Sequence, residues 1–320
     1  MSTIFSDIRS ATRRVVERAE DVSIDEGRLA SYADELADER IDEAERDEDL
    51  HYFGHGGETV AYVVTLDTIN FGSGYFPWSQ PRDGHTDYAM VATALTDRFE
   101  RHGPFRAEEL TELTTEKCGE LFAQEIQHDQ RRRLMASFAH TLGELGEFLA
   151  ANYGGSYVAM VEDADRSAAR LVEILSEIPS FRDVVTYRND EVPFYKRAQS
   201  MAQDLHLAFE GSQWGEFRDI DELTLSADNR VPHVLRLDGV LEYSDELAET
   251  VDSRSFLSAG SAEEIEIRAS ALQAVEGLAD LLGDPQRRMP PRLIDNYLWH
   301  RGQQDRYRVR PAHLTRTVFY

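Results

Sequence analysis

The stretch Thr59-Val-Ala-Tyr-Val-Val-Thr-Leu-Asp-Thr-Ile-Asn-Phe71 is compatible with a strand or a helix, and the fold class of this chain of 320 residues depends on which of them it forms. Its β-branched residues favour a strand by propensity, whereas the helical patterns around it favour a buried helix. A short apolar run fits a buried strand and a buried helix equally well, because neither has a polar face to show. Both interpretations stay open, and the prediction of fold class rests on the remainder of the chain.

Helical periodicity dominates that remainder. Residues 5–20 repeat apolar side chains at the spacing of an amphipathic helix, and residues 27–46 continue as an acidic helix. Ser261-Ala-Glu-Glu264 has the pattern of a capping box, which predicts a helix over 262–282. We therefore predict a mainly α-helical, compact fold with few short strands. The candidate strands are 59–66, 156–161 and a segment at the C-terminus.

Prolines and turn residues indicate where elements begin and end. Pro193 and Pro232 each stand where a proline begins a helix, the first of them running through Lys196. The chain contains no repeat and no clean linker, so residues 1–320 are predicted to form a single domain. The turn-rich segment 179–192 is where two lobes of that domain are expected to meet.

The charge of the chain is strongly negative. The 34 Lys and Arg residues against 60 Asp and Glu residues give a formal net charge of −26, while 41% of the residues are hydrophobic. Disorder requires low hydrophobicity together with high net charge, so we expect a folded protein with an acidic surface. Such a surface suits a cytoplasm of very high salt, where self-repulsion is screened. The composition therefore predicts a halophilic source.

Composition also excludes several classes of function. A surface of this charge repels a nucleic-acid duplex, whose affinity for proteins comes mostly from phosphate neutralisation, so no stable nucleic-acid complex is expected. No apolar run has the length of a membrane span, and the N-terminus lacks a signal-peptide pattern. We expect a cytoplasmic protein without a membrane partner. The single cysteine, Cys118, excludes an intrachain disulfide and a cysteine-based zinc site.

Lys196 is singled out by its rarity. The chain has two lysines, Lys117 and Lys196, against 32 arginines (34 Lys and Arg residues minus two). A lysine retained among so many arginines indicates a position that needs a compact ammonium rather than a planar guanidinium. It would bind a phosphate or pair with a carboxylate. The alternative is a surface lysine on an amphipathic helix.

Asp228 lies just before Val231-Pro232, where a helix is expected to start. An aspartate at this position commonly caps the helix through backbone N–H groups, and the residue pattern alone favours that interpretation. The alternative is a catalytic carboxylate at the mouth of a pocket. The neighbouring polar residues Asn229 and Arg230 are candidates for ligand contacts.

A second polar and aromatic segment follows the apolar stretch. Phe71 belongs to an aromatic group that continues through residues 75–78, and Asp67 and Asn70 lie at its edge. Such a group is most often part of a core. It would otherwise serve as a stacking platform for a flat heterocycle. Asp67 and Asn70 would then hydrogen-bond a base, or they would only satisfy the turn backbone.

Five stretches in order along the chain resemble the queuosine salvage family. They are Leu66–Pro77, Phe194–Gln199, Ala227–Pro232, Ile294–Trp299 and the ending His313-x-x-Arg316-Thr-x-x-Tyr320. The resemblance implies an all-helical relative of helix-hairpin-helix DNA glycosylases. It implies cleavage of the N-glycosidic bond of queuosine 5′-monophosphate, which releases queuine for reinsertion into tRNA, with no metal or organic cofactor.

The resemblance also implies roles for single residues. Asp228 matches the catalytic aspartate, and Lys196 matches the lysine that faces it across the site. Asp295 matches a position that contacts the base, and His51 matches a histidine at the ligand. The 5′-phosphate is expected near Lys196, Arg230 or Arg316.

Three positions depart from the family pattern. An acid is usual where this chain has His300, an aromatic residue is commoner at Asn296, and Phe is frequent at Ser226. All three lie where the resemblance places the modified base. We therefore expect the substrate to be queuosine 5′-monophosphate or a related 7-deazaguanine nucleotide. The alternative function is a non-catalytic module that binds a nucleotide or nucleic acid on the same fold.

Overall fold

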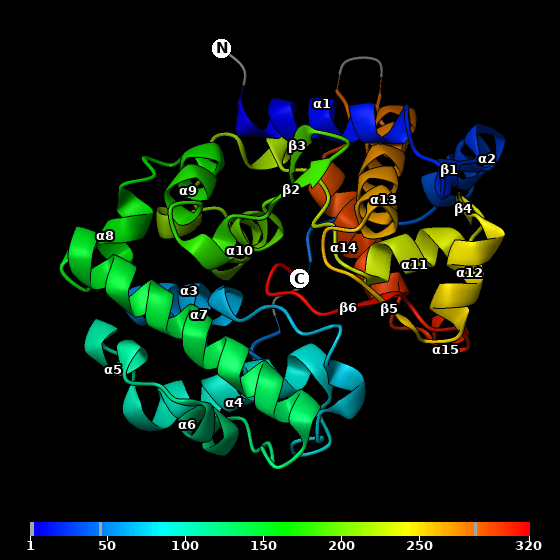
Figure 1. Cartoon of the computed structure of the whole chain (residues 1–320). Helices are drawn as coiled ribbons and strands as arrows, with labels where there is room; N and C mark the ends of the chain where they lie inside the picture. The colour runs from blue at the N-terminus through cyan, green and yellow to red at the C-terminus, as the bar shows by residue number, and fades with distance from the viewer. Residues whose placement is uncertain (1–2, 45–46, 285–286) are drawn as a thin grey trace. The chain divides into compact units, whose positions relative to one another are not determined.

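The computed structural model describes residues 3–44, 47–284 and 287–320 and consists mainly of α-helices with a few short strands (Figure 1). The prediction of a mainly α fold with few short strands is confirmed. The stretch that left the fold class open forms helix α3 (Gly57–Thr68). Every residue from Thr59 to Thr68 is buried, so this helix has no solvent face and shows no amphipathic period. Its β-branched residues reflect complete burial rather than a sheet.

The chain divides into two compact units, which are described one at a time. The first consists of Met1–Ala44, Asp183–Lys196 and Asp221–Arg316, and the second of Glu45–Arg182, Arg197–Ile220 and Thr317–Tyr320. One boundary falls between Arg182 and Asp183, inside the turn-rich segment 179–192. The organisation as a single domain over 1–320 stays a prediction.

Helix α13 (Ala262–Leu281) is the centre of the first unit. Most of its residues are buried, because four other helices of the unit contact it. These are α1 (Ile4–Val16), α2 (Glu26–Ala37), α11 (Arg230–Leu237) and α14 (Pro291–Arg301). Ser261 caps α13 as predicted, since its hydroxyl accepts the N–H of Glu264. The unit also contains α12 (Asp245–Asp252) and α15 (Asp305–Arg308).

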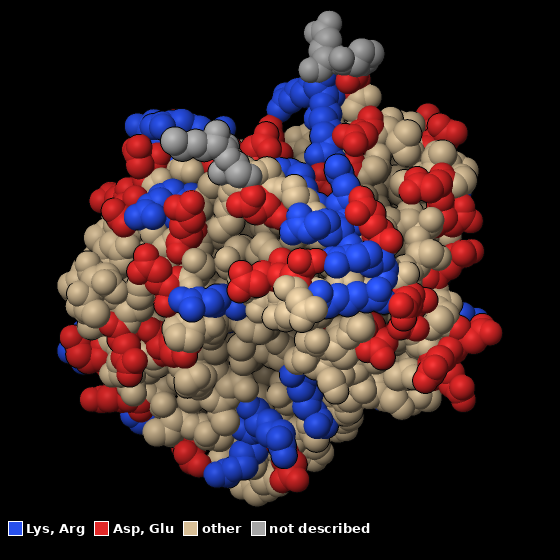
Figure 2. Space-filling view, turned by 45° about the horizontal axis from the view of Figure 1, so that its top comes forward, with Lys and Arg blue, Asp and Glu red and all other residues tan. Residues whose placement is uncertain are grey.

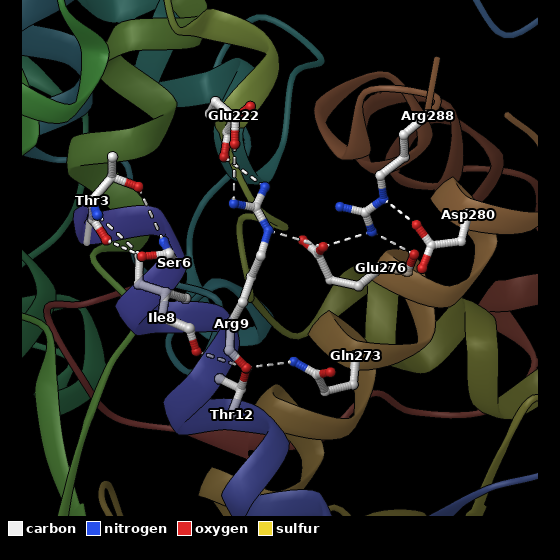
Figure 3. Close-up of polar contacts among 10 residues, drawn as sticks. All are labelled: Thr3, Ser6, Ile8, Arg9, Thr12, Glu222, Gln273, Glu276, Asp280 and Arg288. Atoms are coloured by element: carbon white, nitrogen blue, oxygen red, sulfur yellow. Dashed lines mark hydrogen bonds and ion pairs between the residues drawn. The ribbon is translucent and has the colours of Figure 1, made fainter. Parts of the chain in front are cut away.

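Polar contacts join α1 to α13 (Figure 3). Arg9 Nε donates to Glu276 Oε2 at 3.0 Å, and Gln273 Nε2 donates to Thr12 Oγ1 at 2.7 Å. Arg288 forms a further ion pair with Glu276 at 2.6 Å. The buried residues of α1 are Phe5, Ile8, Ala11, Thr12 and Val15. Their helical spacing is the reason that the pattern of residues 5–20 predicted a helix here, although α1 ends at Val16, four residues before the predicted end.

Three two-stranded sheets complete the first unit. Strand β1 (Val22–Ile24) pairs antiparallel with β4 (Leu241–Tyr243), with Ser23 opposite Glu242. Strands β2 (Val184–Tyr187) and β3 (Asp190–Pro193) form an antiparallel hairpin. Strand β5 (Phe256–Leu257) pairs in parallel with β6 (Leu314–Thr315). These ladders tie loops to the helices and do not form a continuous sheet.

The second unit is helical and is organised on the long helix α7 (Asp129–Tyr153). Helices α5 (Ala107–Thr111) and α6 (Thr115–Leu121) pack on it. A Cβ added to Gly146 of α7 would lie 2.5 Å from the backbone oxygen of Ala107, so the α5–α7 contact requires glycine there. The other helices of the unit are α3, α4 (Asp87–His102), α8 (Tyr157–Glu162), α9 (Ala168–Leu175) and most of α10 (Lys196–Ala208).

Both helix starts predicted from prolines are wrong. Pro193 is the last residue of β3, where it pairs with Val184 in a two-stranded hairpin whose edge tolerates a missing N–H group. Helix α10 begins three residues later at Lys196, after Tyr195 turns the chain with a φ of 49°. Pro232 lies inside the first turn of α11, which begins at Arg230.

Other boundaries also differ from the prediction. The helix expected over 27–46 ends at Ala37 as α2, and residues 45–46 lie outside the described part of the chain. The candidate strands 59–66 and 156–161 are helical, in α3 and α8. The candidate strand at the C-terminus is confirmed as β6.

The surface carries acidic and basic side chains side by side. On the face that Figure 2 shows, Asp and Glu residues are interspersed with Lys and Arg residues. Among the described residues, no helix combines the length and the apolar character needed to cross a membrane. The cytoplasmic location and the halophilic source stay predictions.

Candidate functional site

The candidate site of the first unit contains two carboxyl groups and one ammonium group. Lys196 is the first residue of α10, Asp228 lies two residues before α11, and Asp295 lies on α14. The charges of Lys196 and Asp228 both act on the carboxyl group of Asp295. The structure therefore brings together three residues that span 99 positions of the chain (295 minus 196).

Asp295 is the most perturbed carboxyl group of this site. Removal from bulk water raises its pKa from 3.8 to about 7, and the negative charge of Asp228 acts in the same direction. The ammonium group of Lys196 opposes the rise, as do hydrogen bonds from the backbone and side chain of Ser226. The Ser226 N–H group donates to Asp295 Oδ2 at 2.9 Å. Asp295 therefore exists as both acid and carboxylate near neutral pH.

Asp228 lies one residue before Asn229, the N-cap of α11, and its carboxylate binds backbone N–H groups of the first turn, which is the contact that the residue pattern favoured. Its Oδ1 atom accepts the N–H of Arg230 at 2.7 Å and that of Val231 at 3.4 Å. Its own N–H group donates to the backbone oxygen of Ser226 at 2.7 Å. Within the described residues, no hydrogen bond to Oδ2 is found. One carboxylate oxygen is thus fixed by the helix terminus, and the other is available to a ligand.

Lys196 is buried, so the alternative of a surface lysine is wrong. Only 6% of the surface of this residue is exposed to solvent. Its backbone N–H group donates to Asp183 Oδ2 at 3.2 Å. The tight turn at Tyr195, with its φ of 49°, directs the chain from β3 into α10. A left-handed tyrosine is uncommon, and such strain concentrates at sites that the surrounding structure over-determines.

Arg230 of α11 contacts Trp299 of α14, and its charge acts on the next residue, His300. The Arg230 guanidinium carbon is 4.7 Å from the centre of the Trp299 ring, and Trp299 and His300 meet edge to face at 5.1 Å. Burial lowers the pKa of His300, and the positive charge of Arg230 lowers it further. His300 is consequently neutral at neutral pH. Asn296 lies one turn earlier on the same helix and is partly exposed.

Two predicted residues of the first unit make other contacts. Asn229 Nδ2 donates to the backbone oxygen of His313 at 3.3 Å. Arg316 is exposed, and its guanidinium carbon lies 3.8 Å from the centre of the Phe256 ring. Lys196, one of the three basic candidates for the phosphate, acts with its charge on the Asp295 carboxyl group.

The remaining predicted residues belong to the second unit. His51 Nε2 lies 2.9 Å from the Tyr88 hydroxyl, and His51 Nδ1 lies 2.9 Å from the backbone oxygen of Asp47. Asn70 Nδ2 donates to Asp67 Oδ1 at 2.9 Å. Burial raises the pKa of Tyr88 well above its ordinary value, and the charge of Asp67 contributes. His51 is therefore in contact with Tyr88, and the charge of Asp67 acts on the Tyr88 hydroxyl.

Phe71 is a core residue of the second unit. It is 3% exposed, and its ring meets that of Phe138 edge to face at 5.2 Å. The Arg197 guanidinium carbon lies 5.1 Å from the centre of the same ring. These contacts match the core interpretation of the aromatic group at this residue.

Sequence reasoning missed the residues that support the site. Tyr88 beside His51, and the buried pair Asp183 and Arg268 beside Lys196 and Ala227, carry no local motif. The only signal of Asp183 and Arg268 is the rarity of a buried charge, which becomes visible once burial is known. Within the part of the chain that the structure describes, no three His, Cys, Asp or Glu residues gather as metal ligands. The absence of a cofactor stays a prediction.

The fold and the site define a helical protein with a cluster of two carboxyl groups and one ammonium group. The family described as "Queuosine salvage protein" matches residues 50–320. The chain belongs to this family.

Three relatives each align over more than three quarters of their own length. A protein of Sphaerobacter thermophilus is 36% identical over 98% of this chain and 97% of its own. A protein of Dictyostelium discoideum is 32% identical over 82% of this chain and 78% of its own, and one of Bos taurus is 28% identical over 98% of both. Each of the three is named queuosine 5′-phosphate N-glycosylase/hydrolase.

Proposed function

We propose that this chain hydrolyses the N-glycosidic bond of queuosine 5′-monophosphate, or of a related 7-deazaguanine nucleotide, and releases the free base. The observation that carries the proposal is the cluster of Lys196, Asp228 and Asp295 in one compact unit. The names of the relatives supply the reaction class. Enzymes that cleave glycosidic bonds commonly use two carboxyl groups whose environments differ.

Asp228 is proposed to act on the sugar. Cleavage of the bond between C1′ and the base nitrogen builds positive charge at C1′. The Asp228 carboxylate stabilises that charge, because its Oδ1 atom is held by the N–H of Arg230 and cannot rotate freely. The base leaves with the bonding electron pair. Water adds to C1′, and the proton that water loses balances the one that the base gains.

Asp295 is proposed to bind the base. With a pKa of about 7, its carboxyl group donates a hydrogen bond in one protonation state and accepts in the other. A 7-deazapurine lacks the N7 atom that would accept a proton, so its departure depends on hydrogen bonds elsewhere on the ring. Ser226 holds the Asp295 carboxyl group in place through its N–H group at 2.9 Å.

Lys196 is proposed to bind the anionic part of the nucleotide or to orient Asp228. A buried ammonium is a compact donor of three hydrogen bonds, and the residue is 6% exposed. A 5′-phosphate adds binding energy that is remote from the reacting bond. Arg230 is a second basic candidate for the phosphate in this unit. Its charge acts on His300, one of the three positions that depart from the family pattern.

The proposed partner is the free nucleotide, and no stable complex with a nucleic acid is proposed. A net charge of −26 disfavours the approach of a polyanion. The direct test is incubation of the purified chain with queuosine 5′-monophosphate at several salt concentrations, with chromatographic detection of queuine. Release of queuine, or of the free base from another 7-deazaguanine nucleotide, supports the proposal. Absence of base release from every such nucleotide contradicts it.

A further inference from the structure

We infer that Arg268 and Asp183 form a positioning pair that holds both Lys196 and Asp228 in place for the reaction. The inference rests on the proposed function and deepens it by naming residues outside the motifs. Neither residue is a candidate for contact with the substrate. Their role would be to act through the two residues that are.

The two side chains form a bidentate ion pair in the interior of the first unit. Arg268 Nη1 donates to Asp183 Oδ1 at 3.1 Å, and Nη2 donates to Oδ2 at 2.6 Å. The exposed fractions of the side chains are 0% for Arg268 and 2% for Asp183. A fork of two parallel hydrogen bonds fixes direction as well as distance.

One arm of the pair reaches Lys196. Asp183 Oδ2 accepts the N–H of Lys196 at 3.2 Å, and the backbone oxygen of Asp183 accepts the N–H of Phe194 at 2.9 Å. Asp183 thereby holds both sides of the turn at Tyr195. The position of Lys196 at the start of α10 depends on this carboxylate.

The other arm reaches Asp228. Arg268 Nε donates to the backbone oxygen of Ala227 at 3.0 Å. Ala227 is fully buried and directly precedes Asp228. One guanidinium group therefore connects, through Asp183 and Ala227, the two chain segments that carry the candidate catalytic groups. Those segments are separated by 32 positions along the chain (228 minus 196).

The guanidinium group is held on its remaining sides. Its carbon lies 3.9 Å from the centre of the Phe194 ring, and Nη1 lies 3.6 Å from Glu264 Oε1. A lysine at position 268 would supply one charged group on a flexible stem and could not form these directed contacts together.

Stability alone is a weak reason for such a pair. The desolvation of two buried charges offsets much of their attraction, and apolar residues of similar volume are often equally stable. Preorganisation is a sufficient reason, because a displacement of about 1 Å at a catalytic group lowers the rate by about 100-fold. The pair and its contacts are therefore where the geometry of Lys196 and Asp228 is set.

The test measures kcat and KM for base release in Arg268→Gln, Arg268→Lys and Asp183→Asn. The matched control is Arg236→Gln, which breaks another bidentate pair of the same unit, Arg236 with Asp252, at 2.9 and 3.2 Å. We expect kcat to fall by about 100-fold in the site variants with a change in KM below about threefold. We expect the control to retain its kcat.

A double-mutant cycle separates positioning from a general loss of structure. In an Asp228→Asn background, Arg268→Lys should lower the residual kcat by less than about threefold, because the group that it positions has already been disabled. Equal losses in both backgrounds would overturn the inference. So would a failure of all three variants to fold while the control folds.

An exchange measurement keeps this inference distinct from the proposed function. Amide hydrogen exchange of Lys196 and Arg230 should be faster in Arg268→Lys, while that of the β1–β4 ladder is unchanged. An inactive wild type with this selective loss of protection would overturn the proposed function and leave the positional role standing. Unchanged exchange at both amides would overturn the positional role, whatever the activity.

Discussion

Asp228 Oδ1 accepts the backbone N–H of Arg230 at 2.7 Å, so the residue proposed as the catalytic carboxylate also binds the first turn of α11 from one residue before its N-cap, Asn229. The two roles use different oxygen atoms and are compatible. The helix terminus supplies a partial positive charge beside the carboxylate, and it holds one oxygen still while the other faces a ligand. A capping contact at this residue is therefore part of the site.

Replacement of Lys196 should damage activity even when the charge is kept. We expect Lys196→Arg to lower kcat/KM by at least about 10-fold and Lys196→Ala by about 100-fold, because a planar guanidinium does not fit a buried site built for an ammonium group. The matched control is Lys117→Arg, which changes the other lysine, whose Nζ donates to the backbone oxygen of Glu112 at an exposed position. Full activity in Lys196→Arg would contradict the account.

Asp295 should make stability depend on pH in a defined direction. Its pKa in the folded state is about 7 against an ordinary value of 3.8, so the folded state holds the proton that the unfolded state loses between these values. The contribution to the free energy of unfolding is then full below pH 4 and declines as pH rises to about 7, by about 4 kcal/mol at most. Denaturant titrations of wild type and Asp295→Asn from pH 4 to 8 measure this difference.

The same substitution should simplify the pH dependence of the reaction. Wild-type kcat should show an ionisation near pH 7 that Asp295→Asn lacks. An unchanged profile in the variant would show that another group is responsible. A variant whose stability difference from wild type is constant across that range would contradict the shifted pKa itself.

Salt should stabilise the protein. With a net charge of −26, screening removes more repulsion between like charges than attraction within surface ion pairs. The free energy of unfolding is therefore expected to rise between about 0.1 M and about 1 M KCl. Urea titrations at several KCl concentrations measure it. Greatest stability at the lowest salt would contradict the prediction of a halophilic protein.

Two glycines of α7 offer a matched test of packing in the second unit. A Cβ at Gly146 would lie 2.5 Å from the backbone oxygen of Ala107, whereas a Cβ at Gly143 would meet nothing within 4 Å. Gly146→Ala should lower the free energy of unfolding by about 1–3 kcal/mol. Gly143→Ala should raise it by about 0.5–1 kcal/mol, since alanine is the better helix former. Thermal or denaturant unfolding of the two variants gives both values.

Patterns with a local cause were predictable from the sequence. The spacing of apolar residues located α1, and the Ser261 cap located the start of α13. The two prolines misled for different reasons. Pro193 ends strand β3 of a hairpin, which the Phe194 N–H to the Asp183 oxygen continues by one bond. Pro232 lies inside the first turn of α11, which begins two residues earlier at Arg230. The fully buried α3 had no period to detect.

The candidate site also contains residues that the sequence indicates and residues that only the structure shows. Asp228 was found through its position before a helix, and Lys196 through its rarity. The pair of Arg268 and Asp183 joins residues 85 positions apart, and neither belongs to a motif. Only the structure shows that Arg268, one of 32 arginines, is buried and contacts both Asp183 and Ala227, which adjoin the two segments that carry Lys196 and Asp228.

The most direct test of the central claim compares Asp228→Asn with Asp25→Asn in base release from queuosine 5′-monophosphate. Both carboxylates accept N–H groups of a helix's first turn, Asp25 Oδ1 that of Arg28 at 2.9 Å and Asp228 Oδ1 that of Arg230 at 2.7 Å, and asparagine can keep both contacts through its side-chain oxygen. The account predicts that Asp228→Asn loses activity by at least about 1,000-fold, while Asp25→Asn matches the wild type. Full activity in Asp228→Asn would contradict it.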